Sequence, residues 1–364
     1  MLIAIFALVF AQSVVFARFW TRGLDMKLGL SVENATEGDY ITVREVLENA
    51  KLLPLPWINV KFQVSGNLVF EGTQYAGNGA DTSRSELFSV GPYKRVTRSY
   101  KVLCAERGYY TIKSMSVTGQ DLLMSRRRVT NFSCGESLTV YPAALCIDPF
   151  SPAYRRVMGS VRARRFTNPD PFEFRGIREY LPTDSLRSVN HRASAKTGEL
   201  MVNMFEPTTS RRVTLWLATD PYSATPLPQV YEDSIRLTAA FAEMFIADGL
   251  TAELKTGAMN ILSKGQRVGV QGGAGENHLT AILEALALID LSQPCEPAAD
   301  ILAAADTGED SVHVLICPYD GEDAELAVEK LRGAGQDVIW ILPHRKDTHT
   351  RLAQTGSTFY WEVS

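Results

Sequence analysis

One group of residues that could do chemistry follows the apolar run Val213–Leu217, which has the pattern of a buried strand. The chain continues as "ATDPYSA", so Asp220 and Ser223 come just beyond the strand. Ligands of α/β sheets bind at the carboxyl ends of strands, and carboxylate and hydroxyl oxygens are ligands that Mg²⁺ accepts. These two residues are therefore candidate metal ligands, although "DPYS" is also a common turn sequence.

A second group combines Asp184, His191 and Glu199, which could serve a hydrolytic reaction as acid and base. The G-x-S-x-G, H-E-x-x-H and G-x-x-x-x-G-K patterns are missing from the chain. The glycine-rich run Gly269–His278 could hold an anion on its N–H groups, but we interpret it as a flexible loop in which Asn277 caps a helix. We therefore expect no enzyme activity and no cofactor.

Charge and cysteine content exclude several classes of partner. The formal net charge is −4, which argues against nucleic acid as the main partner. The five cysteines are odd in number and scattered, and none forms a C-x-x-C pair. This indicates neither a zinc site nor a disulfide scaffold, and favours buried free thiols in a reducing compartment.

The N-terminal segment is strongly apolar. Met1–Ala17 contains no charged residue, and the length of the run predicts a transmembrane helix over residues 1–20. Arg18, Arg22 and Lys27 all follow the run, so the positive-inside rule predicts a single-pass protein of the cell membrane with cytoplasmic soluble domains. A signal peptide and a buried core helix are the alternatives.

The remaining chain divides by the period of its hydrophobic residues. Residues 27–141 show period-2 runs separated by turn sequences, which predicts an immunoglobulin-like β-sandwich. Residues 142–212 form an Arg-rich connecting arm. Residues 213–364 alternate strands with amphipathic helices, which predicts an α/β Rossmann-like domain. The predicted fold class is thus an N-terminal transmembrane helix, an all-β immunoglobulin-like sandwich and an α/β Rossmann-like domain.

The connecting arm contains a densely charged stretch between residues 172 and 207. So many charges cannot be buried without partners. Either they pair with one another and pin the arm to its domain, or they face another protein. A set of eleven residues, the signature residues below, carries a recognisable spacing: Arg178, Glu179, Tyr180, Pro182, Asp184, Arg187, His191, Ala195, Lys196, Leu200 and Glu206.

This spacing resembles the bacterial family called domain of unknown function 58, whose arm reads approximately "REY-x-PGD-x-x-R-x-I-x-W-x-x-x-AR-x-x-x-L". The chain departs from that pattern with Thr183 for the usual Gly, His191 for Trp and Lys196 for Arg. The resemblance implies a von Willebrand factor A-like domain over residues 213–364. The family usually has two adjacent membrane helices, whereas this chain shows one apolar run.

The resemblance also implies partners. Members of the family are associated with MoxR-type AAA+ ATPases and often with transglutaminase-like membrane proteins. The metal site of a von Willebrand factor A domain begins with Asp-x-Ser-x-Ser, and here Ala218 stands at the Asp position, so we interpret the site as degenerate. We expect a non-catalytic, membrane-anchored adaptor that docks the ATPase or its client. The alternative is a metal-dependent adhesion or hydrolytic protein with a rebuilt site at Asp220 and Ser223.

Overall fold

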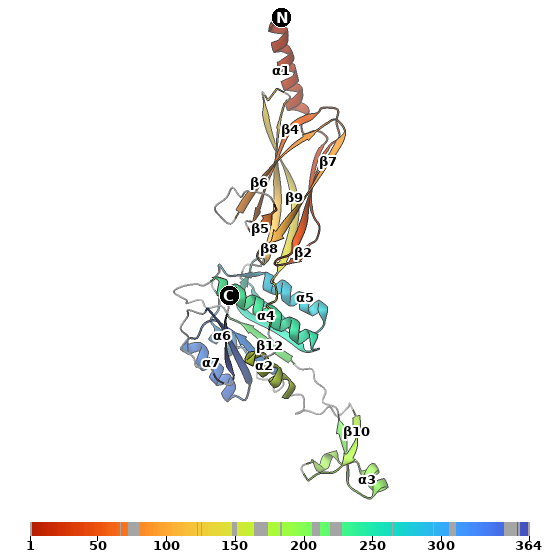
Figure 1. Ribbon diagram of the computed structural model, residues 1–364, viewed down its shortest axis with the longest axis vertical. Coiled ribbons are helices and arrows are strands. Elements are labelled where there is room, and N and C mark those ends of the chain that lie inside the picture. Colours follow the sequence, from red (N-terminus) through yellow and green to blue (C-terminus); the bar gives the residue numbers. More distant parts are fainter. Residues whose placement is uncertain are drawn as a thin grey trace. The chain divides into compact units, whose positions relative to one another are not determined.

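The computed structural model describes residues 2–65, 67–71, 81–121, 123–124, 126–147, 151–163, 174–182, 184–205, 212–218, 228–263, 265–293, 295–305, 311–345, 355 and 357–362. The chain divides into two compact units, residues 1–143 with 286–288 and residues 144–285 with 289–364. The bulk of each unit is built on its own β-sheets (Figure 1).

The first unit consists of one helix followed by short and long strands. Its elements are α1 (Leu2–Phe19), β1 (Leu24–Leu30), β2 (Asn34–Thr36), β3 (Tyr40–Asn49), β4 (Leu55–Ser65), β5 (Leu68–Phe70), β6 (Asp81–Val90), β7 (Lys94–Cys104), β8 (Gly108–Gln120) and β9 (Arg127–Tyr141).

These strands form two sheets that share one hydrophobic core. Their orders are β1-β3-β7-β5 and β2-β9-β8-β4-β6. Successive side chains of a strand point to opposite faces, and every second residue of β3 from Ile41 to Asn49 is buried. Inward side chains of both sheets, such as Leu47, Phe62 and Met115, belong to the same buried cluster. The β-rich character expected for residues 27–141 is confirmed, with the two-layer packing of a sandwich.

The carboxyl end of α1 packs into this core. Phe16 and Trp20 are 2% and 5% exposed, and their rings stack with centroids 6.2 Å apart. The space for the indole comes from Gly119 of β8, because a Cβ built at that position would lie 2.8 Å from the Trp20 ring. A glycine in a long strand thus serves helix–sheet packing.

The predicted transmembrane helix over residues 1–20 is wrong, and so is the predicted single-pass location in the cell membrane. In the part of the chain that the structure describes, no helix is long and apolar enough to cross a bilayer. Trp20, the last residue of the predicted span, is instead covered by the sandwich. The apolar pattern at the end of the run therefore reflects packing against protein.

The second unit contains the remaining helices and strands. They are α2 (Pro152–Ala163), β10 (Phe174–Glu179), the 3₁₀ turn η2 (Leu186–Ser188), α3 (His191–Thr197), β11 (Met201–Phe205), β12 (Arg212–Leu217), α4 (Pro228–Ala247), β13 (Thr251–Asn260), β14 (Arg267–Gly273), α5 (Glu276–Ala287), β15 (Ile289–Asp290), α6 (Ala298–Ala303), β16 (Ser311–Ile316), α7 (Glu322–Gly333), β17 (Asp337–His344) and β18 (Thr358–Glu362).

A seven-stranded mixed sheet is the centre of this unit. Its order is β14-β13-β12-β16-β17-β18, and β15 also pairs with β13. Strand β12 pairs in parallel with β13 and β16, β16 with β17, and β17 with β18. Strands β14 and β15 run antiparallel to β13. Strand β16 is buried along its whole length. Within it His313 accepts a hydrogen bond at Nδ1 from the Trp216 indole, 3.1 Å away, which ties it to β12.

The predicted fold class is wrong. Strands take up 46% of the structure and helices 28%, and neither a transmembrane helix nor a Rossmann-like α/β domain is supported. Two causes are visible. The sheet of the second unit is mixed, because two of its strands are antiparallel to β13. In addition, β10 and β11 form a separate two-stranded sheet in a stretch predicted as a connecting arm.

A carboxyl group lies in the interior of the first unit. Glu45 of β3 is fully buried, and its Oε2 accepts a hydrogen bond from the Tyr100 hydroxyl at 3.2 Å, while Oε1 has no hydrogen-bond partner within the described residues. Arg84 lies over the Tyr100 ring, and its guanidinium pairs with Glu86 at 2.8 Å. Burial is the main cause that raises the pKa of Glu45 from its ordinary value of 4.5 to about 7.

This raised pKa predicts that the first unit is more stable in mild acid. The native state keeps a proton that the unfolded chain releases above pH 4.5, so stability falls as the pH rises from 4.5 to about 7. The total loss is on the order of 3 kcal/mol. Urea unfolding between pH 4.5 and 8 should show this slope, and Glu45→Gln should flatten it. Glu48→Gln, at an exposed position of the same strand, should retain it; equal slopes in the wild type and Glu45→Gln would contradict the assignment.

The contact between α1 and β8 gives a second prediction. Gly119→Ala should destabilise the first unit by about 1–3 kcal/mol, because the new methyl group overlaps the Trp20 ring. Gly29→Ala is the matched control, since a Cβ on that strand residue meets nothing within 4 Å. The midpoint of urea unfolding measures both. In a Trp20→Ala background, Gly119→Ala should lower the free energy of unfolding much less. An equal loss in both backgrounds would show that the new methyl group does not clash with the indole.

Candidate functional site

The signature residues gather on a small module, called the hairpin module here and comprising residues 174–205. Strands β10 and β11 pair antiparallel, with Arg178 opposite Val202 and Glu179 opposite Met201. The turn η2 and helix α3 lie between the two strands in the chain (Figure 1). Neither η2 nor α3 contains a buried residue. The module therefore owes its shape to backbone pairing and polar contacts more than to a core.

One ion pair fixes the turn after β10. The Arg178 guanidinium donates from Nη1 and Nη2 to the two carboxylate oxygens of Asp184, each at 2.6 Å. The same carboxylate accepts from the Leu181 N–H at 2.8 Å, and the Asp184 N–H donates back to the Leu181 carbonyl. The hydrogen bonds from Arg178 lower the pKa of Asp184, and those to Asp184 raise the pKa of Arg178. A bidentate pair of this kind fixes orientation as well as contact.

Helix α3 is held by uncharged side chains that the sequence interpretation missed. Asn190 caps the helix by accepting from the Ala193 N–H at 3.0 Å, and its amide donates to Asn203 of β11 at 2.7 Å. Ser194 accepts from the Met201 N–H at 2.8 Å. The helix ends at Gly198, which has φ of 80°. An Asn before the helix and a Gly after it are standard start and stop signals, so this pattern could have been recognised in the sequence.

The remaining signature residues point mostly to solvent. Tyr180 is half-buried, and the exposed ones are Glu179, Pro182, Arg187, His191, Ala195, Lys196 and Leu200. Glu206 and Thr183 lie outside the described residues. Within the described residues no ion pair involves Arg187, Lys196 or Glu199. One pair of the arm charges thus braces the module, while Arg187, Lys196 and Glu199 are exposed.

The residues considered for chemistry do not assemble into a site among the described residues. Asp184 is engaged by Arg178, and no hydrogen bond links it to His191 or Glu199. No group of three His, Cys, Asp or Glu side chains there could hold a metal ion. Ala218 is buried after β12, while Asp220 and Ser223 lie outside the described residues.

The glycine-rich run Gly269–His278 contains the end of strand β14 and the start of helix α5, and it is not a flexible loop. Gly269 and Gly273 belong to β14, and Asn277 lies inside α5, not at its cap. A Cβ at Gly273 would come within 2.5 Å of the His278 ring, whose Nε2 contacts the Ala252 carbonyl at 2.7 Å. The glycine is needed for this close packing, so the run has a structural role.

The cysteine thiols differ in how deeply they are buried. No disulfide joins the cysteines; Cys104 and Cys317 are buried as expected, whereas Cys146 is exposed. Burial raises the pKa of the Cys104 thiol to about 11, so this group stays protonated and unreactive at neutral pH.

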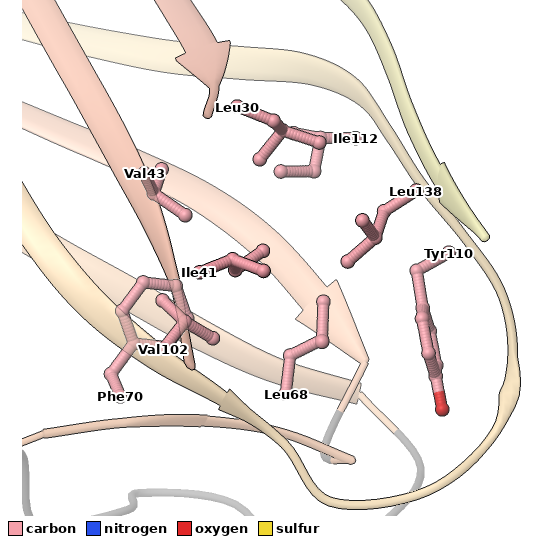
Figure 2. Close-up of a pocket in the computed structure, with 9 residues that line it drawn as sticks. All are labelled: Leu30, Ile41, Val43, Leu68, Phe70, Val102, Tyr110, Ile112 and Leu138. Atoms are coloured by element: carbon pink, nitrogen blue, oxygen red, sulfur yellow. The ribbon is translucent and has the colours of Figure 1, made fainter. Parts of the chain in front are cut away.

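The first unit also contains an apolar cavity, shown in Figure 2. Leu68, Phe70 and Tyr110 are among its lining residues, and the Tyr110 hydroxyl donates to the Glu106 carbonyl at 2.8 Å. The cavity volume is about 10 Å³, the space of roughly one water molecule, and its walls are apolar. It is a packing defect of the sandwich core and too small for a ligand.

Large apolar side chains are exposed at several places on the hairpin module. They lie on β10, on the turn after it, in η2 and before β11: Phe174 (58% exposed), Ile177 (43%), Leu181 (52%), Leu186 (72%) and Leu200 (53%). Val202 is the buried large apolar residue described in the module. A braced module with its apolar residues outside is the strongest candidate for a functional surface.

The Arg178–Asp184 pair makes the turn sensitive to one substitution. Asp184→Asn should speed hydrogen exchange of the Leu181 amide, because the carboxylate that accepts its hydrogen bond loses charge and its Arg partner. Amide exchange followed by NMR measures this opening. Glu199→Gln, an exposed carboxylate of the same module, should leave Leu181 protection unchanged.

The pH dependence of the same turn has a defined sign. Because the folded-state pKa of Asp184 is lowered, the ion pair stabilises the turn at pH values above the ordinary pKa of 3.8. This stabilisation is lost as the pH falls through the lowered pKa. Wild-type Leu181 protection, corrected for the intrinsic exchange rate, should therefore persist at pH 5. Loss of protection at that pH would contradict the pair.

Comparisons with known proteins give distant similarities. No family model matches the chain, and no curated protein matches it. Among solved structures, the CARDB domain of a Pyrococcus furiosus protein, crystallised with di-metal ions, is 13% identical, with a TM-score of 0.20 over 32% of this chain and 93% of that domain. The sporulation control protein Spo0M of Bacillus subtilis is 8% identical, with a TM-score of 0.19 over 43% of this chain and 58% of Spo0M. A β-glucosidase of Listeria innocua is 10% identical, with a TM-score of 0.18 over 31% of this chain and 16% of the enzyme. These scores are too low to assign a family or an activity.

Proposed function

We propose that the chain is a non-catalytic adaptor that docks a partner protein through the hairpin module. The observation that carries this proposal is the exposure of five large apolar side chains on a module of residues 174–205. A contiguous exposed apolar patch marks an interaction surface, and we propose that these side chains contribute to one. Their burial by a partner would supply the hydrophobic free energy of docking.

The bracing of the module favours binding as well. The ion pair between Arg178 and Asp184 and the Asn190 cap hold the turn and helix α3 in one conformation before any partner arrives. A preorganised surface loses less conformational entropy on association than a flexible one. This is a physical reason for polar networks in a segment that buries almost nothing of its own.

The charge of the module defines its partner further. Residues 174–205 contain five basic and three acidic side chains, although the whole chain carries a net charge of −4. The exposed cations Arg187 and Lys196 would border the apolar residues. The complementary partner is therefore an apolar groove with an acidic rim, since opposite charges at a rim steer association.

We further propose that this partner is a MoxR-type AAA+ ATPase or its client. The support is the resemblance of the signature residues to the domain of unknown function 58 family. A transglutaminase-like membrane protein is the second partner that the resemblance suggests.

The test begins with the tagged full-length chain, from which copurifying proteins are identified by mass spectrometry. The recovered AAA+ ATPase is then purified and its affinity for the chain measured with and without nucleotide. Leu186→Asp and Leu200→Asp should each weaken binding at least about tenfold, because a carboxylate would be buried in an apolar groove. Leu326→Asp is the matched control, since Leu326 is 65% exposed on α7, outside the module.

Each outcome is decisive. Retained binding by Leu326→Asp together with loss in both module variants supports the adaptor function. Failure to recover any AAA+ ATPase, or equal affinities for the wild type and the module variants, contradicts it. Thermal unfolding of each variant checks that the loss is not caused by misfolding.

A further inference from the structure

The outer face of the five-stranded sheet carries a shallow pocket with an aromatic wall. Its volume is about 160 Å³, and it is lined by Trp57, Asn59, Leu87, Thr118, Gln120 and Arg127. The strand register explains why these residues meet. Trp57 pairs with Gln120, which pairs with Arg127, and the next row places Leu87, Asn59 and Thr118 side by side. Directly opposite residues on one face have Cβ atoms about 5 Å apart.

A β-bulge presents the aromatic ring. Leu55 pairs with Val90 and Ile58 pairs with Phe88, so Pro56 and Trp57 together oppose the single residue Ser89. The extra residue bends the strand and re-aims the neighbouring side chain. Leu55 and Ile58, three positions apart, are therefore both fully buried, while Trp57 beside Ile58 faces outward and is 39% exposed. A large aromatic surface is thus open to solvent on a rigid sheet.

The polar wall consists of groups that both donate and accept hydrogen bonds. The Ser85 hydroxyl donates to Asn59 Oδ1 at 2.7 Å, which fixes the amide and directs its N–H donors elsewhere. Thr118 and Gln120 add a hydroxyl and a second amide on the neighbouring strand. None of the lining residues is acidic, and Arg127 is the one charged group among them.

We propose that this pocket binds a saccharide, with Trp57 as the stacking platform. The C–H groups of a pyranose face carry partial positive charge and suit the negative face of an indole ring. Sugar hydroxyls are donors and acceptors at once, which matches the two amides and the hydroxyl of the wall. The pocket volume accommodates about one ring of a chain, and Arg127 at its end suits a sugar carboxylate.

This inference is independent of the proposed adaptor function, because the pocket lies on the first unit and the hairpin module on the second. A peptide strand would bind at a sheet edge through backbone groups, whereas the pocket lies on the sheet face. A nucleic acid would require a basic surface, and the pocket contains a single guanidinium.

The test uses the full-length chain and three defined hexasaccharides: cellohexaose, chitohexaose and hexagalacturonate. Saturation-transfer NMR detects binding, and isothermal titration calorimetry gives the dissociation constants. At least one probe should bind, and Trp57→Ala should weaken that binding at least tenfold while Trp57→Phe retains most of it. Arg127→Ala should weaken hexagalacturonate binding selectively. Tyr40→Ala, at a 65% exposed aromatic residue of the other sheet, is the matched control and should bind as the wild type does.

Two results would overturn the proposal. One is the absence of saturation transfer to all three probes at millimolar concentration. The other is equal affinity of the wild type and Trp57→Ala, which would place any binding elsewhere on the chain. Circular dichroism and thermal unfolding of Trp57→Ala separate lost contacts from lost structure, and Trp57→Phe keeps the test valid if the alanine variant does not fold.

Discussion

The alternation of side chains along paired β-strands is the constraint on which the first unit depends. Because successive residues point to opposite faces, the register of β3, β4 and β8 decides at once what enters the core and what remains outside. The same rule that buries Ile58 and Val60 leaves Asn59 on the surface. It also carries Glu45 inward between Val43 and Leu47, where its carboxyl group must be accommodated among arginine and tyrosine side chains.

The sequence was informative where local pattern decides structure. Period-2 runs predicted strands within residues 27–141, where β3 and β4 lie, and the apolar run Val213–Leu217 forms the buried strand β12. The sequence was less informative where contacts between residues far apart in the chain determine the structure. The polar strand β6, with Arg84 and Glu86, and helix α2 had no pattern that set them apart. Trp20 illustrates the limit, because its burial depends on a glycine about a hundred residues further along the chain.

The candidate site shows the same division. The charged stretch was recognisable as important, yet which charges pair could not be deduced from spacing. Arg178 and Asp184 meet because the turn after β10 folds the chain back, whereas Arg187 and Lys196 are left outward by the path of η2 and α3. The exposure of Leu186 and Leu200 was also invisible, since apolar residues near a strand pattern would ordinarily be assigned to a core.

The bulge at Pro56 and Trp57 has one more consequence, for self-association. It lies where β4 meets β6, the outermost strand on that side of the five-stranded sheet. An open edge is a template for further strands, and proteins protect such edges with bulges, prolines and charges. The bulge increases the local twist of the β4–β6 pair, and Arg84 and Glu86 place charges along β6. The bulge beside Trp57 and the charges of β6 are thus features that disfavour the growth of copies of the chain into one continuous sheet.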